Sequence, residues 1–424
     1  MYVKIFNEVV NIMHHDYAGY LDKKGWDEPE KYKEYIKELD CNQELNDERF
    51  VEIVQDYLLD FKDTHMSFSK LNQKGEKSFD LGFNVRRFED KLYVTAVGNE
   101  RRLKRKDTII SLNNISIPKL VVKHQREFME TKAEREDWRR IIQKYTTAEV
   151  INTNGESQVL TLKRYEKSVY TPEHTIKKLN ADTLLMTLTD FFNPDTINQL
   201  IEEHKQNLEE TKNLIIDVRI NYGGSDKSFQ GLVNYLFPAE PTTLDFSDYA
   251  MTFNCTERNA KLQTKILEED LKRVEDKEIQ KMGKNLIKKW QENIGKGFVK
   301  FDIQDSNVEV VGQTTPKNII VLSDVFCGSA GDIFVYLCKM SPKITVIGRA
   351  TQGMNDYSNL TTMKWNNRLK FSYPTSRLDQ LDHRGTLGKP GIKPDIYIPW
   401  TPEHIEKDIE LEEALRLLDT MRVV

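Results

Sequence analysis

The chain has 424 residues, of which 62 are lysine or arginine and 67 are aspartate or glutamate, giving a net charge of −5 at neutral pH. This length allows two or three domains, each with its own hydrophobic core. A weakly acidic chain offers no bulk attraction for nucleic acid or anionic membranes, so neither is expected as a partner. No stretch approaches the ~20 apolar residues that span a bilayer. The first residues lack the apolar core of a signal peptide, which favours a soluble cytoplasmic protein, although a chain that had lost its signal peptide would look the same.

The first 75 residues contain two stretches in which apolar residues recur at helical spacing. They are Ile5, Val9, Ile12 and Met13 in the first stretch and Phe50, Ile53, Val54, Tyr57 and Leu58 in the second. This spacing places apolar side chains on one face of a helix. We therefore expect an N-terminal helical domain over residues 1–75.

Residues 78–166 show shorter apolar runs that are typical of strands, at 92–97, 108–112 and 158–162. Turn residues separate the runs, and a helix is expected between about 119 and 143. The pattern predicts a small mixed domain.

From residue 175 to 424 the pattern alternates between strands and helices. The expected strands are 184–188, 214–218, 319–322, 345–347 and 369–373, and the expected helices are 195–208, 228–236 and 332–340. This alternation predicts an α/β layer architecture. Residues 256–296 interrupt it with a charged helical insertion, which could act as a lid, as a contact in a homo-oligomer or as a solvated surface hairpin.

The stretch VLSDVFCGSAGDIFVYLCK (321–339) changes from a strand pattern to a helix pattern around Ser329. Glycine on both sides lets such a turn lift a serine hydroxyl into a cleft, where it can act as a nucleophile. On local pattern alone, the more common interpretation is a plain helix N-cap above Asp332. Cys327 is an alternative nucleophile, but its sequence neighbourhood offers no basic group that would lower the pKa of its thiol.

A second glycine-rich turn lies in LIIDVRINYGGSDKSF (214–229), where Gly223 and Gly224 follow a buried strand. Two glycines let a substrate carbonyl approach closely and leave backbone N–H groups available. Together with the Ala330 N–H, they could form an oxyanion hole. Taken alone, the pair is more often a simple turn, and the stretch lacks the spacing of a phosphate-binding loop.

A serine hydroxyl needs a base that takes its proton. Of the eight histidines, His65 stands out because it follows the second helical pattern and lies beside Thr64 in a polar turn. A lone histidine in such a turn is usually structural.

Four ordered motifs resemble the C-terminal processing (tail-specific) peptidases and the related tricorn core protease. They are Asp217-Val218-Arg219-x-Asn221-x-Gly223-Gly224, Ser329-Ala330-Gly331-Asp332, VIGRATQG (346–353) and GIKPDIYI (391–398). The resemblance covers about residues 180–400. It implies a serine endopeptidase with a crotonase/ClpP-like α/β domain over 175–424, polypeptide substrates, and no metal or organic cofactor.

The resemblance also implies that residues 78–166 form a PDZ-like domain. Within it, Leu81-Gly82-Phe83 resembles the loop that binds a peptide carboxylate. Lys106-Asp107 stands where the family often has Gly-Asp, so the domain departs from the usual pattern.

The chain departs from the processing peptidases at the base. They pair their serine with a lysine, and the corresponding position here holds Met354, whose thioether cannot take the proton. The tricorn branch uses a histidine after a small hydroxyl residue, which Thr64-His65 matches, so the resemblance implies His65 as the general base for Ser329. The orienting glutamate of that branch is missing from the Leu-Gly-Lys-Pro stretch at 387–390. Asp356 is the preferred substitute and Asp382 the other candidate.

A rival hypothesis follows from the same departures. Loss of both the lysine and the glutamate is compatible with a catalytically inactive protein that binds peptides or apolar ligands on the same fold. An esterase would share the acyl transfer step and has the same sequence pattern.

Overall fold

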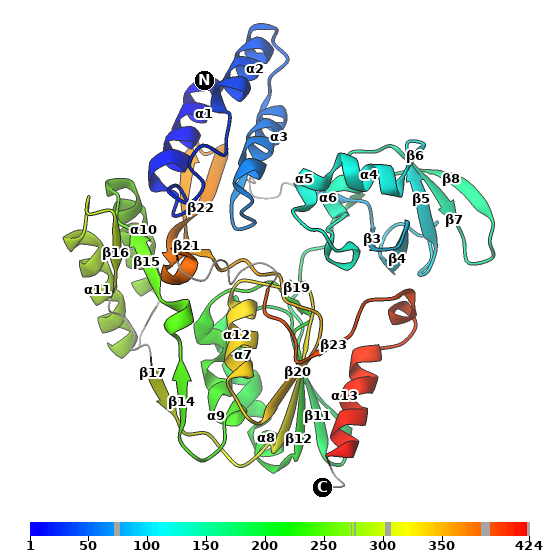
Figure 1. The fold of residues 1–424 in the computed structure, drawn as a ribbon, viewed down its shortest axis with the longest axis vertical. Helices are drawn as coiled ribbons and strands as arrows, with labels where there is room; N and C mark the ends of the chain where they lie inside the picture. The colour runs from blue at the N-terminus through cyan, green and yellow to red at the C-terminus, as the bar shows by residue number, and fades with distance from the viewer. Residues whose placement is uncertain (72–76, 273, 275–276, 302–306, 383–390, 422–424) are drawn as a thin grey trace. The chain divides into compact units, whose positions relative to one another are not determined.

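The structure is a computed structural model of the chain and describes residues 1–71, 77–272, 274, 277–301, 307–382 and 391–421 (Figure 1). The chain divides into two compact units. The first contains Met1–Lys74, Thr243–Glu309 and Gly353–Lys389, and the second contains Gly75–Thr242, Val310–Gln352 and Pro390–Val424. No described helix is both long enough and apolar enough to cross a bilayer.

The first unit combines helices with an antiparallel sheet. Its helices are α1 (Tyr2–Asn11), α2 (Pro29–Cys41), α3 (Asp47–Leu58), α10 (Glu257–Leu271) and α11 (Lys277–Glu292). Its strands are β1 (Ser67–Lys70), β15 (Met251–Asn254), β16 (Phe298–Lys300), β21 (Tyr357–Trp365) and β22 (Leu369–Leu378). In this five-stranded sheet β22 pairs with β1, β15 and β21. The late strand β22 therefore holds together strands from three separate parts of the chain.

The N-terminal helices share one hydrophobic core with the β21–β22 hairpin. Each of α1 and α3 buries one apolar face, as its spacing predicts. These faces pack with Phe371 and Tyr373 of β22 in a single cluster. Phe68 of β1 bridges the two, with its ring centroid 5.6 Å from Phe50 and 6.3 Å from Phe371. The start of the chain is therefore stabilised by residues that come much later in the sequence.

The second unit contains two sheets. The first is six-stranded and lies in the region of the predicted PDZ-like domain. Its strands are β3 (Phe83–Phe88), β4 (Lys91–Val97), β5 (Thr108–Leu112), β6 (Ile115–Ser116), β7 (Thr147–Ile151) and β8 (Ser157–Thr161), and a separate short pair is made by β2 (Phe79–Asp80) and β9 (Tyr165–Glu166). All its strand pairs are antiparallel.

The prediction of a single helix between 119 and 143 is wrong. Three short helices take its place: α4 (Ile117–Lys123), α5 (Gln125–Phe128) and α6 (Arg139–Ile142). α5 stops because the next residue, Met129, adopts a left-handed conformation with φ 53°. A left-handed residue at this position ends a helix.

The second sheet is the α/β core of the chain, as the alternating pattern predicts, except that the strand expected at 369–373 is β22 of the first unit's antiparallel sheet. Its strands are β10 (His174–Asn180), β11 (Thr183–Leu188), β12 (Asn213–Asp217), β18 (Asn318–Ser323), β20 (Ile344–Gly348) and β23 (Ile396–Tyr397), in this order. Only β10 runs antiparallel to its neighbour. The helices around it are α7 (Pro194–Glu203), α8 (Lys205–Glu210), α9 (Val233–Leu236), α12 (Ala330–Lys339) and α13 (Ile409–Thr420).

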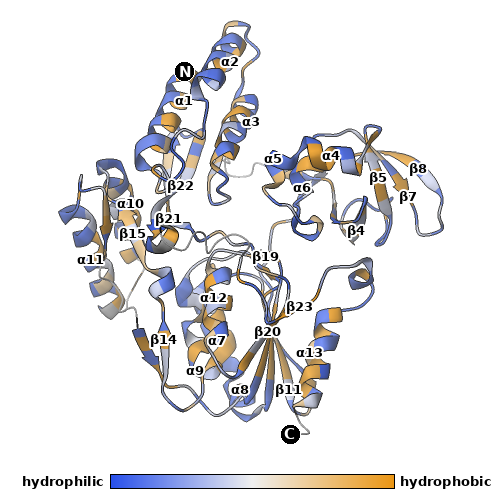
Figure 2. Cartoon of the chain, in the orientation of Figure 1, coloured by the Kyte–Doolittle hydropathy of each residue, from blue (hydrophilic) through white to orange (hydrophobic). Residues whose placement is uncertain are grey.

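Helices cover both faces of this sheet, with α7 and α12 on one side and α13 on the other (Figure 1). Because both faces are covered, the parallel strands read as hydrophobic runs, which Figure 2 shows in orange. Ile215, Ile320 and Ile347 on three neighbouring strands pack against Ala414 and Leu418 of α13. This packing fixes the parallel strands whose carboxyl ends carry the two glycine-rich turns.

Candidate active site

Ser329 occupies a sharp turn between the end of β18 and the start of α12. It is the N-cap residue of α12, with φ 58° and ψ −120°, a conformation that side-chain-bearing residues rarely adopt. Asp332 in the first helical turn accepts the Ser329 N–H at 2.9 Å. The serine therefore takes part in a helix cap and also carries backbone strain, which accumulates at functional sites and is typical of a nucleophile turn.

The diglycine bend lies against this turn because the two preceding strands run parallel. β12 pairs with β18, and beyond them β13 (Ile220–Asn221) pairs in parallel with β19 (Phe326–Cys327). The Gly328 N–H donates to the Asn221 carbonyl at 3.0 Å. A Cβ built on Gly223 would lie 2.7 Å from the Ser329 Cβ and 2.8 Å from the Gly328 carbonyl. Only glycine fits at residue 223, and its backbone lies directly beside the serine.

The backbone N–H groups around the serine differ in their partners. The Gly223 N–H donates to Asn221 Oδ1 at 3.0 Å. Within the described part of the chain, neither the Gly224 N–H nor the Ala330 N–H has a protein acceptor. The Gly224 and Ala330 N–H groups are therefore candidate donors to a ligand oxygen. Gly223 matters chiefly because a side chain there would clash with Ser329.

The Cys327 thiol lies fully buried behind the turn. Burial raises the pKa of the Cys327 thiol well above its usual range, and the neighbouring Asp332 carboxylate adds to the effect. A neutral, inaccessible thiol is a poor nucleophile. This disfavours the cysteine alternative to Ser329.

His65 belongs to the first unit and follows α3 in a short turn before β1. Its ring is buried, with the residue 8% exposed. Its Nδ1 lies 2.6 Å from the Tyr357 carbonyl oxygen, at the start of β21. Because a carbonyl can only accept, Nδ1 carries a proton, and in the neutral ring Nε2 then keeps its lone pair. This tautomer is the one that can take a proton through Nε2.

A buried hydrogen-bond network lies behind the histidine. Asp63 accepts the His65 N–H at 2.9 Å and the Tyr17 hydroxyl at 2.7 Å. Lys23 donates to the same hydroxyl at 2.8 Å, and its ammonium lies 4.3 Å from the Tyr357 ring centroid. Burial and the Asp63 carboxylate raise the pKa of Tyr17 well above its usual range, so it stays a donor. The network fixes the backbone on both sides of the imidazole.

Asp356, the preferred candidate acid, lies in the segment that contacts this histidine. Asp356 immediately precedes Tyr357, and its carbonyl accepts the Leu378 N–H at 3.0 Å. Burial raises the pKa of Tyr357, with Asp22, Asp63 and Asp356 adding to it in decreasing order. The side chain of Asp382 and the 387–390 stretch lie outside the described residues. Met354 belongs to the same unit as Asp356 and His65.

The predicted peptide-binding loop lies before β3 in the second unit. Leu81 is buried, and Gly82 has φ 72°. The Gly82 N–H donates to Asp80 Oδ1 at 2.8 Å, and its carbonyl accepts from the Gly98 N–H at 2.8 Å. A peptide carboxylate at this loop would therefore need N–H groups other than that of Gly82, such as that of Phe83.

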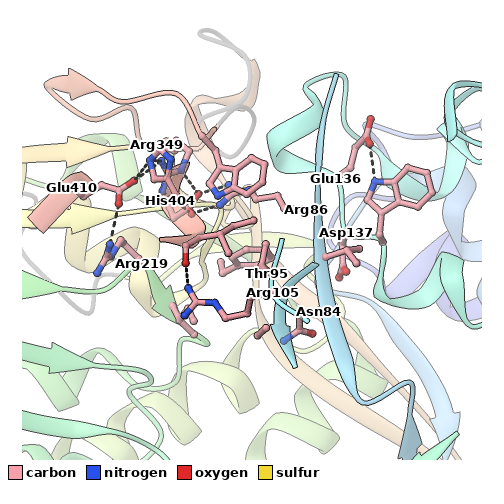
Figure 3. A pocket seen from close by; sticks show the side chains of 18 of the residues that line it. Asn84, Arg86, Thr95, Arg105, Glu136, Asp137, Arg219, Arg349, His404 and Glu410 are labelled. Carbon is pink, nitrogen blue, oxygen red and sulfur yellow. Dashed lines mark hydrogen bonds and ion pairs between the residues drawn. The ribbon is translucent and has the colours of Figure 1, made fainter. Parts of the chain in front are cut away.

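The strand ends beneath the nucleophile turn are held by buried ion pairs. Asp324 lies five residues before Ser329. Its carboxylate accepts hydrogen bonds from the two terminal guanidinium nitrogens of Arg86, on β3, at 2.6 and 2.8 Å. Arg349 reaches it from the end of β20 at 2.8 Å and also pairs with Glu410 at 2.5 Å. Figure 3 shows Arg349, His404 and Glu410 converging at this end of the sheet.

These charges line a cavity of about 470 Å³ in the second unit (Figure 3). Burial would raise the pKa of Asp324, but the Arg86 and Arg349 guanidinium groups hold it well below its usual range. Within this cavity Asp324 pairs with Arg86 and Arg349, and Arg349 pairs with Glu410, so these ion pairs fix Asp324 and the backbone that leads to Ser329.

The structure therefore brings the predicted residues together in two groups. Ser329, Ala330, Gly223 and Gly224 meet in the second unit, and His65 lies near the segment of Asp356 in the first. Sequence reasoning missed the Tyr357 carbonyl, because a backbone acceptor leaves no signature in side-chain identity. It could have assigned Asn221, since an asparagine two residues before a glycine readily accepts that glycine's N–H.

Solved structures of mature CPAF share this fold. Mature CPAF matches with a TM-score of 0.65 at 12% identity, over 98% of this chain and 96% of that chain. Mature CPAF complexed with lactacystin matches with a TM-score of 0.63 at 12% identity, over 99% and 97%. The photosystem II D1 C-terminal processing protease gives a TM-score of 0.45 at 13% identity, over 95% and 94%. No curated protein sequence matches the chain.

The family model described as peptidase family S41 matches residues 182–398, which is just over half of the chain. The match includes both glycine-rich turns and the strands β12, β18 and β20 that position them. The chain belongs to peptidase family S41, a family of serine peptidases.

Proposed function

We propose that the protein is a serine endopeptidase that hydrolyses polypeptides by acyl transfer, with Ser329 as nucleophile and His65 as general base. The observation that carries this proposal is the Ser329 turn, where a strained serine lies directly against Gly223 and beside two backbone N–H groups without protein acceptors. Strain at one serine, together with an adjacent set of donors, is the arrangement that acyl transfer requires.

The reaction starts when Ser329 Oγ attacks the carbonyl carbon of a peptide bond and its proton passes to His65 Nε2. The negative charge moves to the carbonyl oxygen, which the Gly224 and Ala330 N–H groups stabilise, while Gly223 leaves room for it. The imidazolium then protonates the leaving amine as the C–N bond breaks, leaving an ester on Ser329. His65 then takes a proton from a water molecule, and the resulting hydroxide attacks the ester carbonyl carbon. His65 returns the proton to Oγ as the ester C–O bond breaks.

This mechanism requires His65 Nε2 to come within ~3 Å of Ser329 Oγ, directly or through one water. The Nδ1 bond to the Tyr357 carbonyl supports it, because it leaves Nε2 unprotonated. Asp356 would stabilise the imidazolium by its charge from the neighbouring position. Met354 leaves the chain without the lysine that the processing peptidases use as base.

The substrate would be an unfolded or loosely folded polypeptide. Leu81-Gly82-Phe83 would bind its carboxyl end, as expected for a tail-specific protease with a PDZ-like domain. Metal and organic cofactors play no part in the proposed steps. A homo-oligomer through the α10–α11 helices remains a further expectation of the sequence.

Labelling with a serine-directed fluorophosphonate tests the proposal. We expect one adduct, mapped by mass spectrometry to Ser329, that disappears in Ser329→Ala and persists in the matched control Ser157→Ala, which changes an exposed serine on β8. Labelling that survives Ser329→Ala would contradict the proposal. Lactacystin, which is present in one of the similar structures, is a second probe for the same variants.

Measurement of casein hydrolysis distinguishes a peptidase from a catalytically inactive binding protein. Hydrolysis lost in both Ser329→Ala and His65→Ala supports the peptidase. Peptide binding by the wild-type protein with neither labelling nor hydrolysis supports an inactive binding protein on the same fold.

A further inference from the structure

Three aromatic side chains lie together beside the diglycine bend: Tyr170, Phe192 and Tyr222, here called the aromatic platform. They are 43%, 59% and 46% exposed, respectively. The Tyr170 ring centroid lies 5.3 Å from that of Tyr222 and 6.4 Å from that of Phe192, both edge to face. Large aromatic groups that stay exposed side by side commonly mark a binding surface.

Asp190 holds the aromatic platform in place. Its carboxylate is only 1% exposed and accepts the Tyr170 hydroxyl at 2.7 Å and the Phe192 N–H at 3.0 Å. The Tyr170 hydroxyl also reaches Thr189 Oγ1 at 3.0 Å. Burial raises the pKa of Tyr170 to about 12, with the Asp190 carboxylate adding to the effect, so this hydroxyl stays a donor at neutral pH. The rings are therefore anchored before any ligand arrives.

The neighbouring residues separate into a buried side and an exposed side. Phe191 is fully buried, with its ring centroid 5.2 Å from Phe229 and 5.5 Å from Phe334 of α12. Phe192, the next residue, is exposed. Asn221 is likewise buried, whereas Tyr222 is exposed. The buried residues Phe191 and Asn221 therefore belong to the protein interior, whereas the rings of Phe192 and Tyr222 are exposed.

The aromatic platform is continuous with the bend beside Ser329. The Tyr222 N–H donates to the Thr189 carbonyl at 3.0 Å, and the Phe191 N–H donates to the Gly223 carbonyl at 2.8 Å. Tyr222 immediately precedes Gly223, which abuts the Ser329 Cβ. Because two residues of extended chain span about 7 Å, a peptide with its carbonyl at Ser329 has side chains one or two residues away within reach of the residues next to the bend, among them Tyr222.

We propose that Tyr170, Phe192 and Tyr222 form a substrate subsite that receives a bulky apolar side chain within two residues of the scissile bond. The inference rests on the proposed function and adds a substrate class to it. The occupant is a polypeptide segment, because the platform adjoins the Gly224 N–H, a backbone donor that suits a peptide carbonyl.

The test uses six-residue peptides blocked at both ends, with alanine throughout except for one phenylalanine placed at each position in turn. The all-alanine peptide is the reference, and mass spectrometry locates the cut. We expect the cut to keep a fixed distance from the phenylalanine. We also expect kcat/KM for the best peptide to exceed that of the reference roughly tenfold or more, a discrimination that apolar pockets reach.

Variants assign this preference to the aromatic platform. Phe192→Ala and Tyr222→Ala should lower kcat/KM roughly tenfold for the phenylalanine peptide and change that of the all-alanine peptide less than about twofold. Phe79→Ala is the matched control, since Phe79 is 52% exposed and lies on β2 outside the platform. An equal loss for both peptides in the platform variants, or the same selective loss in Phe79→Ala, overturns the subsite.

A binding measurement separates this inference from the proposed function. Fluorescently labelled peptides are titrated with Ser329→Ala protein, with and without Phe192→Ala. Tighter binding of the phenylalanine peptide that is lost in the double variant supports the subsite, even where the wild-type protein hydrolyses nothing. Equal affinity for the phenylalanine and all-alanine peptides overturns the subsite, whatever the hydrolytic activity.

Discussion

The His65 imidazole donates its Nδ1 proton to the backbone carbonyl of Tyr357 over 2.6 Å, across 292 positions of sequence. A carbonyl sets the tautomer as well as a carboxylate does, because both only accept. It carries no net charge, however, so it stabilises an imidazolium less. In the proposed mechanism His65 is therefore well oriented, and any charge stabilisation comes from other groups.

Tyr357→Phe should leave hydrolysis within about threefold of wild type, because the orienting group is the backbone carbonyl, while general-base catalysis itself is worth about 10²–10⁴. The lost hydroxyl donates to Asp22 at 2.9 Å, and Arg377 still pairs with that carboxylate. We expect a stability cost of about 1 kcal/mol. Casein hydrolysis and urea unfolding measure the two effects, with His65→Ala as the inactive control. A collapse of activity in a folded Tyr357→Phe protein would contradict orientation by the carbonyl.

Asp356→Asn distinguishes a supporting charge from a full orienting acid. Since Nδ1 already has a partner, we expect kcat to fall about tenfold, whereas loss of the acid of a triad costs ~10⁴. The comparison is the kcat of Asp356→Asn with that of Asp356→Glu, which keeps the charge and should recover most of the loss. A fall near 10⁴ would mean that the Asp356 carboxylate replaces the Tyr357 carbonyl as the acceptor of the Nδ1–H hydrogen bond during turnover.

The α/β fold could be predicted because the buried strands β11, β12 and β18 are apolar runs followed by helical patterns. The approach of Gly223 to Ser329 could also be predicted, since both follow neighbouring parallel strands of one sheet. The sequence also predicts the Gly224 and Ala330 N–H groups as donors, whereas the hydrogen bond from the Gly223 N–H to Asn221 depends on the detailed turn geometry.

Other features depend on pairings that no local pattern reports. The helices of the first 60 residues share their core with Phe371 and Tyr373. Both the Tyr357 carbonyl at His65 and the Asp190 carboxylate under the aromatic platform arise from such long-range packing. A sequence pattern gives the type of an element, whereas its partner across the fold depends on tertiary packing.

Ser329→Gly should be more stable than Ser329→Ala. Both variants lack the nucleophile, but alanine keeps the strained φ of 58° and glycine adopts it freely. Relief of one strained residue is worth about 1 kcal/mol or more. Thermal unfolding of the two inactive proteins compares them directly, and a glycine variant that melts below the alanine variant would show that the turn is unstrained.

Gly223→Ala should abolish most of the activity, by roughly 10²-fold or more, because the added Cβ displaces the serine from its near-attack position. Gly155→Ala is the matched control, since Gly155 also has positive φ, 87°, but an added Cβ there meets nothing within 4 Å. Both changes carry the backbone cost of about 1 kcal/mol, and only the first adds a clash with Ser329. Equal activity of the two variants would place the bend away from the reacting groups.

Asp324→Asn tests the ion pairs beneath the nucleophile turn through their pH dependence. Arg86 and Arg349 hold the folded pKa of Asp324 below its unfolded value near 3.9, so the pair stabilises fully above that pH and loses its contribution as the pH falls below it. We expect Asp324→Asn to lower the unfolding free energy by about 3 kcal/mol at pH 7, since it leaves buried guanidinium charge unpaired. The deficit should shrink towards pH 3, because the unfolded wild-type chain then binds a proton at Asp324 and the wild-type protein loses part of this stabilisation. Urea unfolding at both pH values measures this, with Asp90→Asn at an exposed position as control. A deficit that is the same at both pH values would show that the folded pKa of Asp324 is not lowered, and would contradict the hold of Arg86 and Arg349 on this carboxylate.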